Sequence, residues 1–250
     1  MELDWGLIAF AAPAVVFAGI SKGGFGSGAS FAAAAILALV LEPGQAIGIM
    51  LPLLMLMDVS ALKPFWGKWS WPEARLLILG SLPGLLVGGY FYHSVNADVF
   101  RIMIGVIAIG FVLWQGALKL NMGPNADRPM PVWAGAIAGA VAGFTSFVSH
   151  AGGPPAAVYL LSRGLAKTPY QATTVLAFWT INLLKFIPYF MLGIFTAQTF
   201  LIDLVLAPFA VIGVWIGVRL HFRIPERLFF VLTYILLLMT GAKLIFDGLT

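Results

Sequence analysis

The chain has 250 residues, of which 61% are hydrophobic and only 10% are charged, and its formal net charge is +4. A soluble domain of this length cannot bury so many apolar side chains, so the composition excludes a soluble globular protein and predicts an integral membrane protein. Cysteine is absent, which excludes disulfide bonds and thiolate metal sites.

The chain begins with the acidic residues Glu2 and Asp4, whereas a secretory signal needs a basic start, so we expect the first apolar segment to be retained. Successive apolar segments follow, and most are long enough for a helix to cross the hydrocarbon layer, which takes about 20 residues. We therefore predict an all-α integral membrane protein, a polytopic helical bundle. The segments are residues 5–20, 29–41, 45–63, 74–92, 99–118, 131–148, 154–162, 169–190, 199–218 and 227–246.

Two glycine-rich clusters lie between the shorter segments. The first is GISKGGFGSGASF, residues 19–31, and the second is SHAGGPP, residues 149–155. Glycine tolerates backbone angles that other residues resist, and irregular backbone at membrane depth occurs where it faces a cavity. Each cluster therefore predicts a broken helical hairpin, and whether each hairpin crosses the membrane or only re-enters it stays open.

The two halves of the chain resemble each other in the order of their features. The glycine pair at 23–24 recurs at 152–153, and the glycines at 84 and 88 recur at 213 and 217 with the same offset along the chain. The latter four glycines are also typical of close helix packing, which is the simpler interpretation for them. Together these features predict an internal repeat.

The repeat predicts two membrane domains, residues 1–120 and 131–250. Gln45 and Gln171, each of which opens a segment after its hairpin, occupy similar positions in the two halves. The first half is predicted to contain the hairpin 5–41 and helices 45–63, 74–92 and 99–118, and the second half the hairpin 131–162 and helices 169–190, 199–218 and 227–246.

The positive charges predict the orientation in the membrane. When each hairpin counts as two segments, most of the Lys and Arg side chains lie in or beside the odd-numbered connections. Because basic residues concentrate on the cytoplasmic side, we expect these connections in the cytoplasm and both termini outside. Because each half then has five segments, an odd number, the second half enters the membrane from the opposite side, and the two repeats are inverted. The basic residues on that side are Lys22, Lys63, Lys68, Arg75, Lys119, Arg128, Arg163, Lys167, Arg219, Arg223 and Arg227.

Both clusters precede a new helix, and a helix that starts inside the membrane directs unpaired N–H groups and a partial positive charge at its first turn. This geometry predicts a small-anion site, to which Lys22 and His150, at equivalent positions of the repeat, would add one basic side chain from each half. Alternatively, the glycines serve packing, Lys22 reaches the headgroups and the hydroxyls bind their own backbone. The candidate substrate-binding residues are Ser21, Lys22, Gly23, Gly24, Gly26, Ser27, Ser149, His150, Gly152 and Gly153.

Two further charges, Asp58 and Lys185, lie inside apolar segments at nearly equivalent positions of the two halves. A charge at the bilayer centre costs at least ~2.5–3.5 kcal/mol on insertion scales, so a functional reason is expected. The two could pair with each other, or Asp58 could carry a proton while Lys185 neutralises an anion. Both could also lie near helix ends and reach the headgroups. Asn182 is a third polar residue that could face the same cavity.

The motifs GISKGGFGSG and SHAGGPPAAVYLL, each opening a half of similar helices, resemble those of the sulfite exporter TauE/SafE family of membrane proteins. This resemblance covers nearly the whole chain. It implies transport of small sulfur-containing anions, such as sulfite or the organosulfonate sulfoacetate, across the cytoplasmic (inner) membrane of a bacterium.

We therefore predict a secondary transporter, more specifically an exporter, that binds its anion between the two hairpin tips at the membrane midplane. No GxxxxGK[ST] motif is present, so gradients rather than nucleotide hydrolysis would supply the energy. A passive anion channel is the alternative. A membrane hydrolase is disfavoured because we count Asp58 as the only acidic residue deep in a segment. The expected partners are the anion and the lipid bilayer, with protons as coupling ion and a homodimer left open, and neither nucleic acid, cofactor nor metal.

Overall fold

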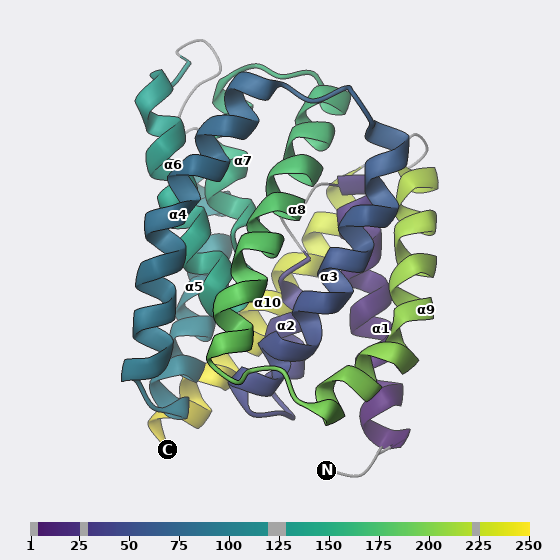
Figure 1. Cartoon of the computed structure of the whole chain (residues 1–250), viewed down its shortest axis with the longest axis vertical. Helices are drawn as coiled ribbons and strands as arrows, with labels where there is room; N and C mark the ends of the chain where they lie inside the picture. The colour runs from purple at the N-terminus through teal and green to yellow at the C-terminus, as the bar shows by residue number, and fades with distance from the viewer. Residues whose placement is uncertain (1–4, 26–29, 120–128, 222–225) are drawn as a thin grey trace.

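The computed structural model describes residues 5–25, 30–119, 129–221 and 226–250, and throughout these ranges its regular structure is helical. The predicted all-α fold is therefore confirmed (Figure 1). The elements are α1 (Trp5–Ile20), η1 (Ser21–Phe25), α2 (Ala32–Leu37), α3 (Pro43–Phe65), α4 (Trp71–Ser94), α5 (Ala97–Lys119), α6 (Val132–Ser149), α7 (Gly153–Ser162), α8 (Lys167–Met191), α9 (Ala197–Leu220) and α10 (Glu226–Leu249).

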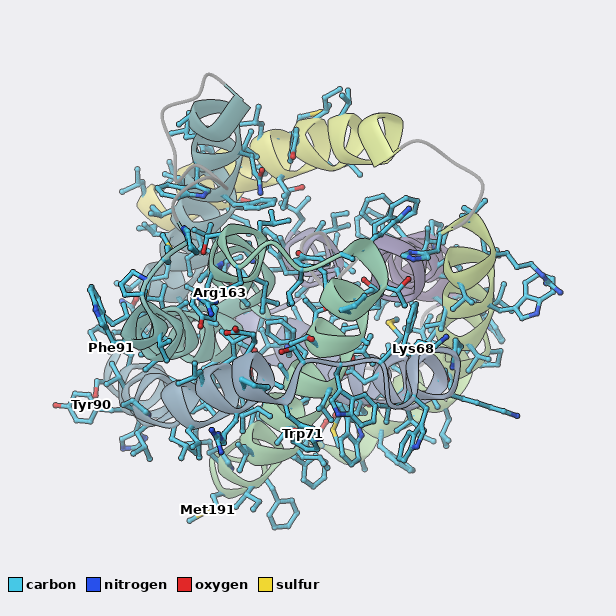
Figure 2. The ribbon with its side chains drawn as sticks, turned by 90° about the horizontal axis from the view of Figure 1, so that it is seen from above. Lys68, Trp71, Tyr90, Phe91, Arg163 and Met191 are labelled. Carbon is cyan, nitrogen blue, oxygen red and sulfur yellow. The ribbon has the colours of Figure 1, made fainter. Side chains whose placement is uncertain are left out.

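The long helices suit a membrane. Seven helices of the described ranges are long and apolar enough to cross one. Large apolar side chains face outward, as a lipid environment requires: Tyr90 is 73% exposed and Met191 is 79% exposed, and Figure 2 shows both projecting away from the bundle. The chain is therefore a multi-pass helical membrane protein.

The ends of the helices fall into two groups at opposite ends of the bundle. The start of α1 and the end of α10 lie at the lower end in Figure 1, together with the connection between α8 and α9. The connections that hold Lys68 and Arg163 lie at the upper end. These two basic connections, which we expect in the cytoplasm, are thus on the opposite end from the start of α1 and the end of α10.

Glycines allow helices from different halves to pack closely. α1 lies along α9, and α4 lies along α6. A Cβ atom on Gly213 would lie 2.5 Å from the carbonyl oxygen of Val16, and one on Gly84 would overlap the carbonyl of Ala140. The packing interpretation of these glycines is therefore confirmed.

The two glycine-rich clusters are built differently. Within the first, η1 continues α1 as a turn of π-helix, and the new helix α2 that follows the cluster has only six residues. In the second, α6 ends at Ser149, His150 takes a left-handed conformation with φ of 57°, and α7 begins at Gly153. The first cluster does precede a new helix, since α2 begins at Ala32, but its residues Ser21–Phe25 extend the first helix.

Candidate functional site

Five polar side chains inside the bundle form two hydrogen-bonded groups, Lys22–Asp58–Asn182 and Lys185–His150, which are neighbours because Asn182 and Lys185 share α8. Lys22 comes from η1, Asp58 from α3, Asn182 and Lys185 from α8, and His150 from the break after α6. None of the five is more than 5% exposed. The alternative that Lys22, Asp58 and Lys185 reach the headgroups does not fit this burial.

Asp58 has a partner for each carboxylate oxygen. The ammonium group of Lys22 forms an ion pair with Oδ1, and Nδ2 of Asn182 donates to Oδ2 at 2.7 Å. The alternative pairing of Asp58 with Lys185 is therefore not the one in the structure. The π-helical turn brings Lys22 to Asp58, while Lys185 lies one helical turn beyond Asn182.

Lys185 is surrounded by uncharged acceptors. Its Nζ donates to the carbonyl oxygen of Ser146 at 2.8 Å, to the Ser146 hydroxyl at 3.1 Å and to Nδ1 of His150 at 2.7 Å. Among the described residues, no carboxylate lies within ion-pair distance of this nitrogen. A buried ammonium group without a counter-charge is costly, so this position suits a group that meets an anion.

The hydrogen bonds of His150 assign its tautomer. Nε2 lies 2.9 Å from the carbonyl oxygen of Ile47, which can only accept, so Nε2 carries a proton. Nδ1 then accepts from Lys185 and must be unprotonated. The ring is neutral in this arrangement, and the cation of this group is Lys185 rather than His150.

Two side chains outside the predicted set hold the backbone of the first cluster. Nε2 of Gln171 donates to the carbonyl oxygen of Lys22 at 2.7 Å, and Nδ1 of His221 lies 2.6 Å from the carbonyl oxygen of Gly24. A break in a helix leaves carbonyl groups that need new donors inside a membrane. The matching positions of Gln45 and Gln171 were the only sign of this role in the sequence.

The other candidate residues of the first cluster either pack against neighbouring helices or lie outside the described ranges. Ser21 is fully buried. A Cβ on Gly23 would overlap the backbone of Val214, and one on Gly24 would overlap that of Gly217, so these glycines let η1 approach α9. The predicted residues Gly26 and Ser27 lie outside the described ranges.

In the second cluster, the hydroxyl of Ser149 donates to the carbonyl of Thr145 at 3.2 Å and so binds its own helix. Gly152 packs against the Ala142 carbonyl, 2.8 Å from where a Cβ would stand. Gly153 begins α7 and is followed by two prolines, which lack N–H groups. The first turn of α7 therefore offers fewer backbone donors than an ordinary helix N-terminus.

Asp203 is a second acidic residue inside an apolar helix, so counting Asp58 as the only one was wrong. It lies in α9, is 6% exposed, and its Oδ1 has no hydrogen-bond partner among the described residues. Its place near the start of the predicted segment 199–218 made it look like a terminal residue.

A separate polar cluster fixes the upper end of the second hairpin. The hydroxyl of Tyr159 donates to Glu73, and Nε of Arg163 donates to the same carboxylate at 3.0 Å. The hydrogen bond with Glu73 raises the pKa of Arg163, which lies in the loop after α7. This cluster joins α7 to the start of α4.

Comparison with known proteins agrees with this architecture. The family model described as Sulfite exporter TauE/SafE matches residues 11–244. No curated protein and no solved structure matched the chain. Membership implies a membrane transporter of sulfur-containing anions such as sulfite. The chain belongs to the sulfite exporter TauE/SafE family.

Proposed function

We propose that this chain is a secondary transporter that exports sulfite or a small organosulfonate such as sulfoacetate, and that the anion binds beside Lys185. The observation that carries this proposal is the buried Lys185 ammonium group, which has only uncharged acceptors around it. With both lysines protonated, Lys22, Asp58 and Lys185 together carry one positive charge. A monoanion such as hydrogensulfite would neutralise the group, and burial strengthens that attraction.

The side chains rather than the helix N-termini are then the main binding groups. α2 is too short to contribute a helix terminus, and the two prolines of α7 remove donors from its first turn. Ser146 and His150 hold the ammonium group of Lys185 in place. The second hairpin tip thereby positions the cation for the anion.

An inverted repeat of residues 1–120 and 131–250 fits the contacts. Lys22 meets Asp58 within the first half, and His150 meets Lys185 at the corresponding positions of the second half. The helix pairs α1–α9 and α4–α6 also correspond when the halves are exchanged. Such a repeat supports alternating access, in which the site opens to either side in turn. The orientation we propose places the loops of Lys68 and Arg163 in the cytoplasm.

Protons are the proposed coupling ion, carried by Asp58. A proton on this carboxylate would remove its charge and weaken its ion pair with Lys22, which would free η1 to move. Asp58→Asn should then abolish stimulation by a pH gradient while sparing anion exchange. Asp203→Asn is the matched control, since it removes another buried carboxyl group outside these contacts.

The test is flux into proteoliposomes for sulfite, sulfate, sulfoacetate and malonate, each with and without a pH gradient. We expect saturable flux of sulfite or sulfoacetate that is accelerated by the same anion on the opposite side. Lys185→Gln should raise KM by on the order of 100-fold, which corresponds to about 2.7 kcal/mol of binding free energy. Lys63→Gln removes an exposed charge at the end of α3 and should match the wild type.

Two results would contradict the proposal. Flux that neither saturates nor responds to anion on the opposite side would indicate a passive channel. A Lys185→Gln variant that folds and transports with unchanged KM would remove the anion from this position.

A further inference from the structure

Two cavities whose walls include polar side chains lie towards opposite ends of the bundle, above and below the buried polar residues. The upper cavity, of about 430 Å³, lies between the start of α8 and the end of α9 and is lined by residues that include Gly24, Gln115, Lys167, Tyr170, Gln171 and His221. The lower cavity, of about 340 Å³, lies between the start of α3 and the end of α4 and is lined by residues that include Glu42, Gln45, Tyr92, Asn96, Ile194 and Thr196.

Each cavity lies near one of the two hydrogen-bonded groups. In the wall of the upper cavity, Gln171 donates directly to the carbonyl of Lys22 at 2.7 Å. In the wall of the lower cavity, Gln45 lies just before Ile47, whose carbonyl oxygen is 2.9 Å from His150. The upper cavity is thus linked to Lys22 through Gln171, and the lower cavity lies near the Ile47–His150 contact that leads to Lys185.

The two cavities occupy corresponding places in the two halves. Gln45 in the lower wall matches Gln171 in the upper wall, and Tyr92 matches His221, at offsets along the chain close to those of the buried pairs. The cavities therefore have the positions expected of the two access routes of one central site.

Their charged residues differ in sign. The upper cavity has the ammonium group of Lys167 in its wall, where it donates to the carbonyl of His221 at 2.7 Å. The lower cavity has the carboxylate of Glu42, which pairs with Arg101 at 2.9 Å, and Arg101 also pairs with Asp98. At the edge of the lower cavity, two carboxylates thus share one guanidinium group. The lower cavity is therefore more negative at its edge than the upper cavity.

We propose that the upper cavity is a second anion-binding site, a loading vestibule in which Lys167, Gln171 and Gln115 hold the sulfite or sulfonate ion before it reaches Lys185. The lower cavity is the release side, where Glu42 disfavours rebinding of the anion. A pocket lined by charges of one sign raises the local concentration of ions of the opposite sign. This inference rests on the proposed function. It adds that the affinity for the substrate differs between the two sides of the protein.

The experiment measures KM separately from each side of the protein. A Lys68→Cys variant, reconstituted at no more than one protein per vesicle, is treated with an impermeant biotin reagent. Vesicles with the upper end outward are then captured on streptavidin, and the unbound fraction holds the opposite orientation. Initial rates of sulfite and sulfoacetate uptake are measured in both fractions. We expect KM from the upper side to be lower by on the order of tenfold.

Variants assign this difference to the cavity walls. Lys167→Gln should raise KM from the upper side alone, and Lys167→Arg should restore it. Glu42→Gln should lower KM from the lower side. The control is Lys63→Gln, which removes an exposed charge from the upper end outside the cavity lining.

The outcomes separate the inference from the proposed function. Saturable transport with equal KM from both sides would overturn the loading vestibule while leaving the transporter intact. If Lys167→Gln and Lys63→Gln have the same KM from the upper side, the loading vestibule is also overturned. Absence of sulfite and sulfoacetate flux from both sides would overturn the proposed function, and the vestibule with it.

Discussion

Asn182 and Lys185 lie one helical turn apart on α8, and each binds a side chain of a different half: Asn182 donates to Asp58, and Lys185 donates to His150. Residues at this spacing share one face of a helix. A single face of α8 therefore connects the Lys22–Asp58 pair to the second hairpin tip. Any rotation of α8 must disturb both contacts together, which couples the two halves of the site.

The Lys22–Asp58 pair should be strongly interdependent. Lys22→Met or Asp58→Leu alone leaves one charge buried without its partner and should cost about 3–5 kcal/mol of unfolding free energy. The double variant should lose much less than the sum of the two single losses. Thermal unfolding in detergent gives the stability of the wild type, the two single variants and the double variant, which form a double-mutant cycle. Additive losses would mean that the pair contributes no coupling.

Acid should weaken transport because it protonates His150. A proton added at Nδ1 removes the acceptor for Lys185 and places two cations side by side, so activity should fall as the pH decreases. A basic His150 side chain that binds the anion, as the sequence predicted, would have the reverse effect, namely an affinity for the anion that falls as the pH rises. Flux of a simple sulfonate, whose own charge stays constant, should be measured from about pH 8 down to about pH 4.5, below the usual imidazole range, because a buried ring that faces an ammonium group resists protonation.

His150→Gln provides the control for this pH dependence. Its amide oxygen can accept from Lys185 but does not titrate, so the variant should transport with a flat profile over the same range. A profile in His150→Gln that declines as in the wild type would assign the titration to another group.

Gly23→Ala should damage folding rather than anion binding. The added methyl group would meet the backbone of Val214 on α9, which cannot move without separating η1 from that helix. We expect a loss of about 2 kcal/mol or more in unfolding free energy, as for other overpacked core sites. Gly110→Ala is the matched control, because nothing lies within 4 Å of its Cβ position, and it should be neutral or stabilising by about 0.5–1 kcal/mol.

Cysteine labelling tests the orientation in this cysteine-free chain. Lys68→Cys lies in the connection at the upper end and Ala197→Cys at the start of α9 at the lower end, and both positions are exposed. In intact cells an impermeant maleimide should label position 197 and spare position 68. The opposite result would invert the topology, and labelling of both would show leaky cells.

The spanning helices were predictable because apolar length is a local property of the sequence. Asp58 and Lys185 were also identifiable, because a charge inside an apolar segment is costly. The partner of Asp58 was not, since it depends on a π-helical turn that redirects Lys22. The glycines of the first cluster were ambiguous for another reason: close approach to a helix and close approach to a ligand demand the same residue.

The left-handed backbone at His150 has an evolutionary consequence. Side chains with a Cβ disfavour a φ of 57°, so glycine at this position would relieve strain while removing the acceptor for Lys185. Selection for thermal stability alone would thus tend to discard the histidine. Random libraries screened for melting temperature should enrich His150→Gly, and libraries screened for sulfite tolerance should retain His150.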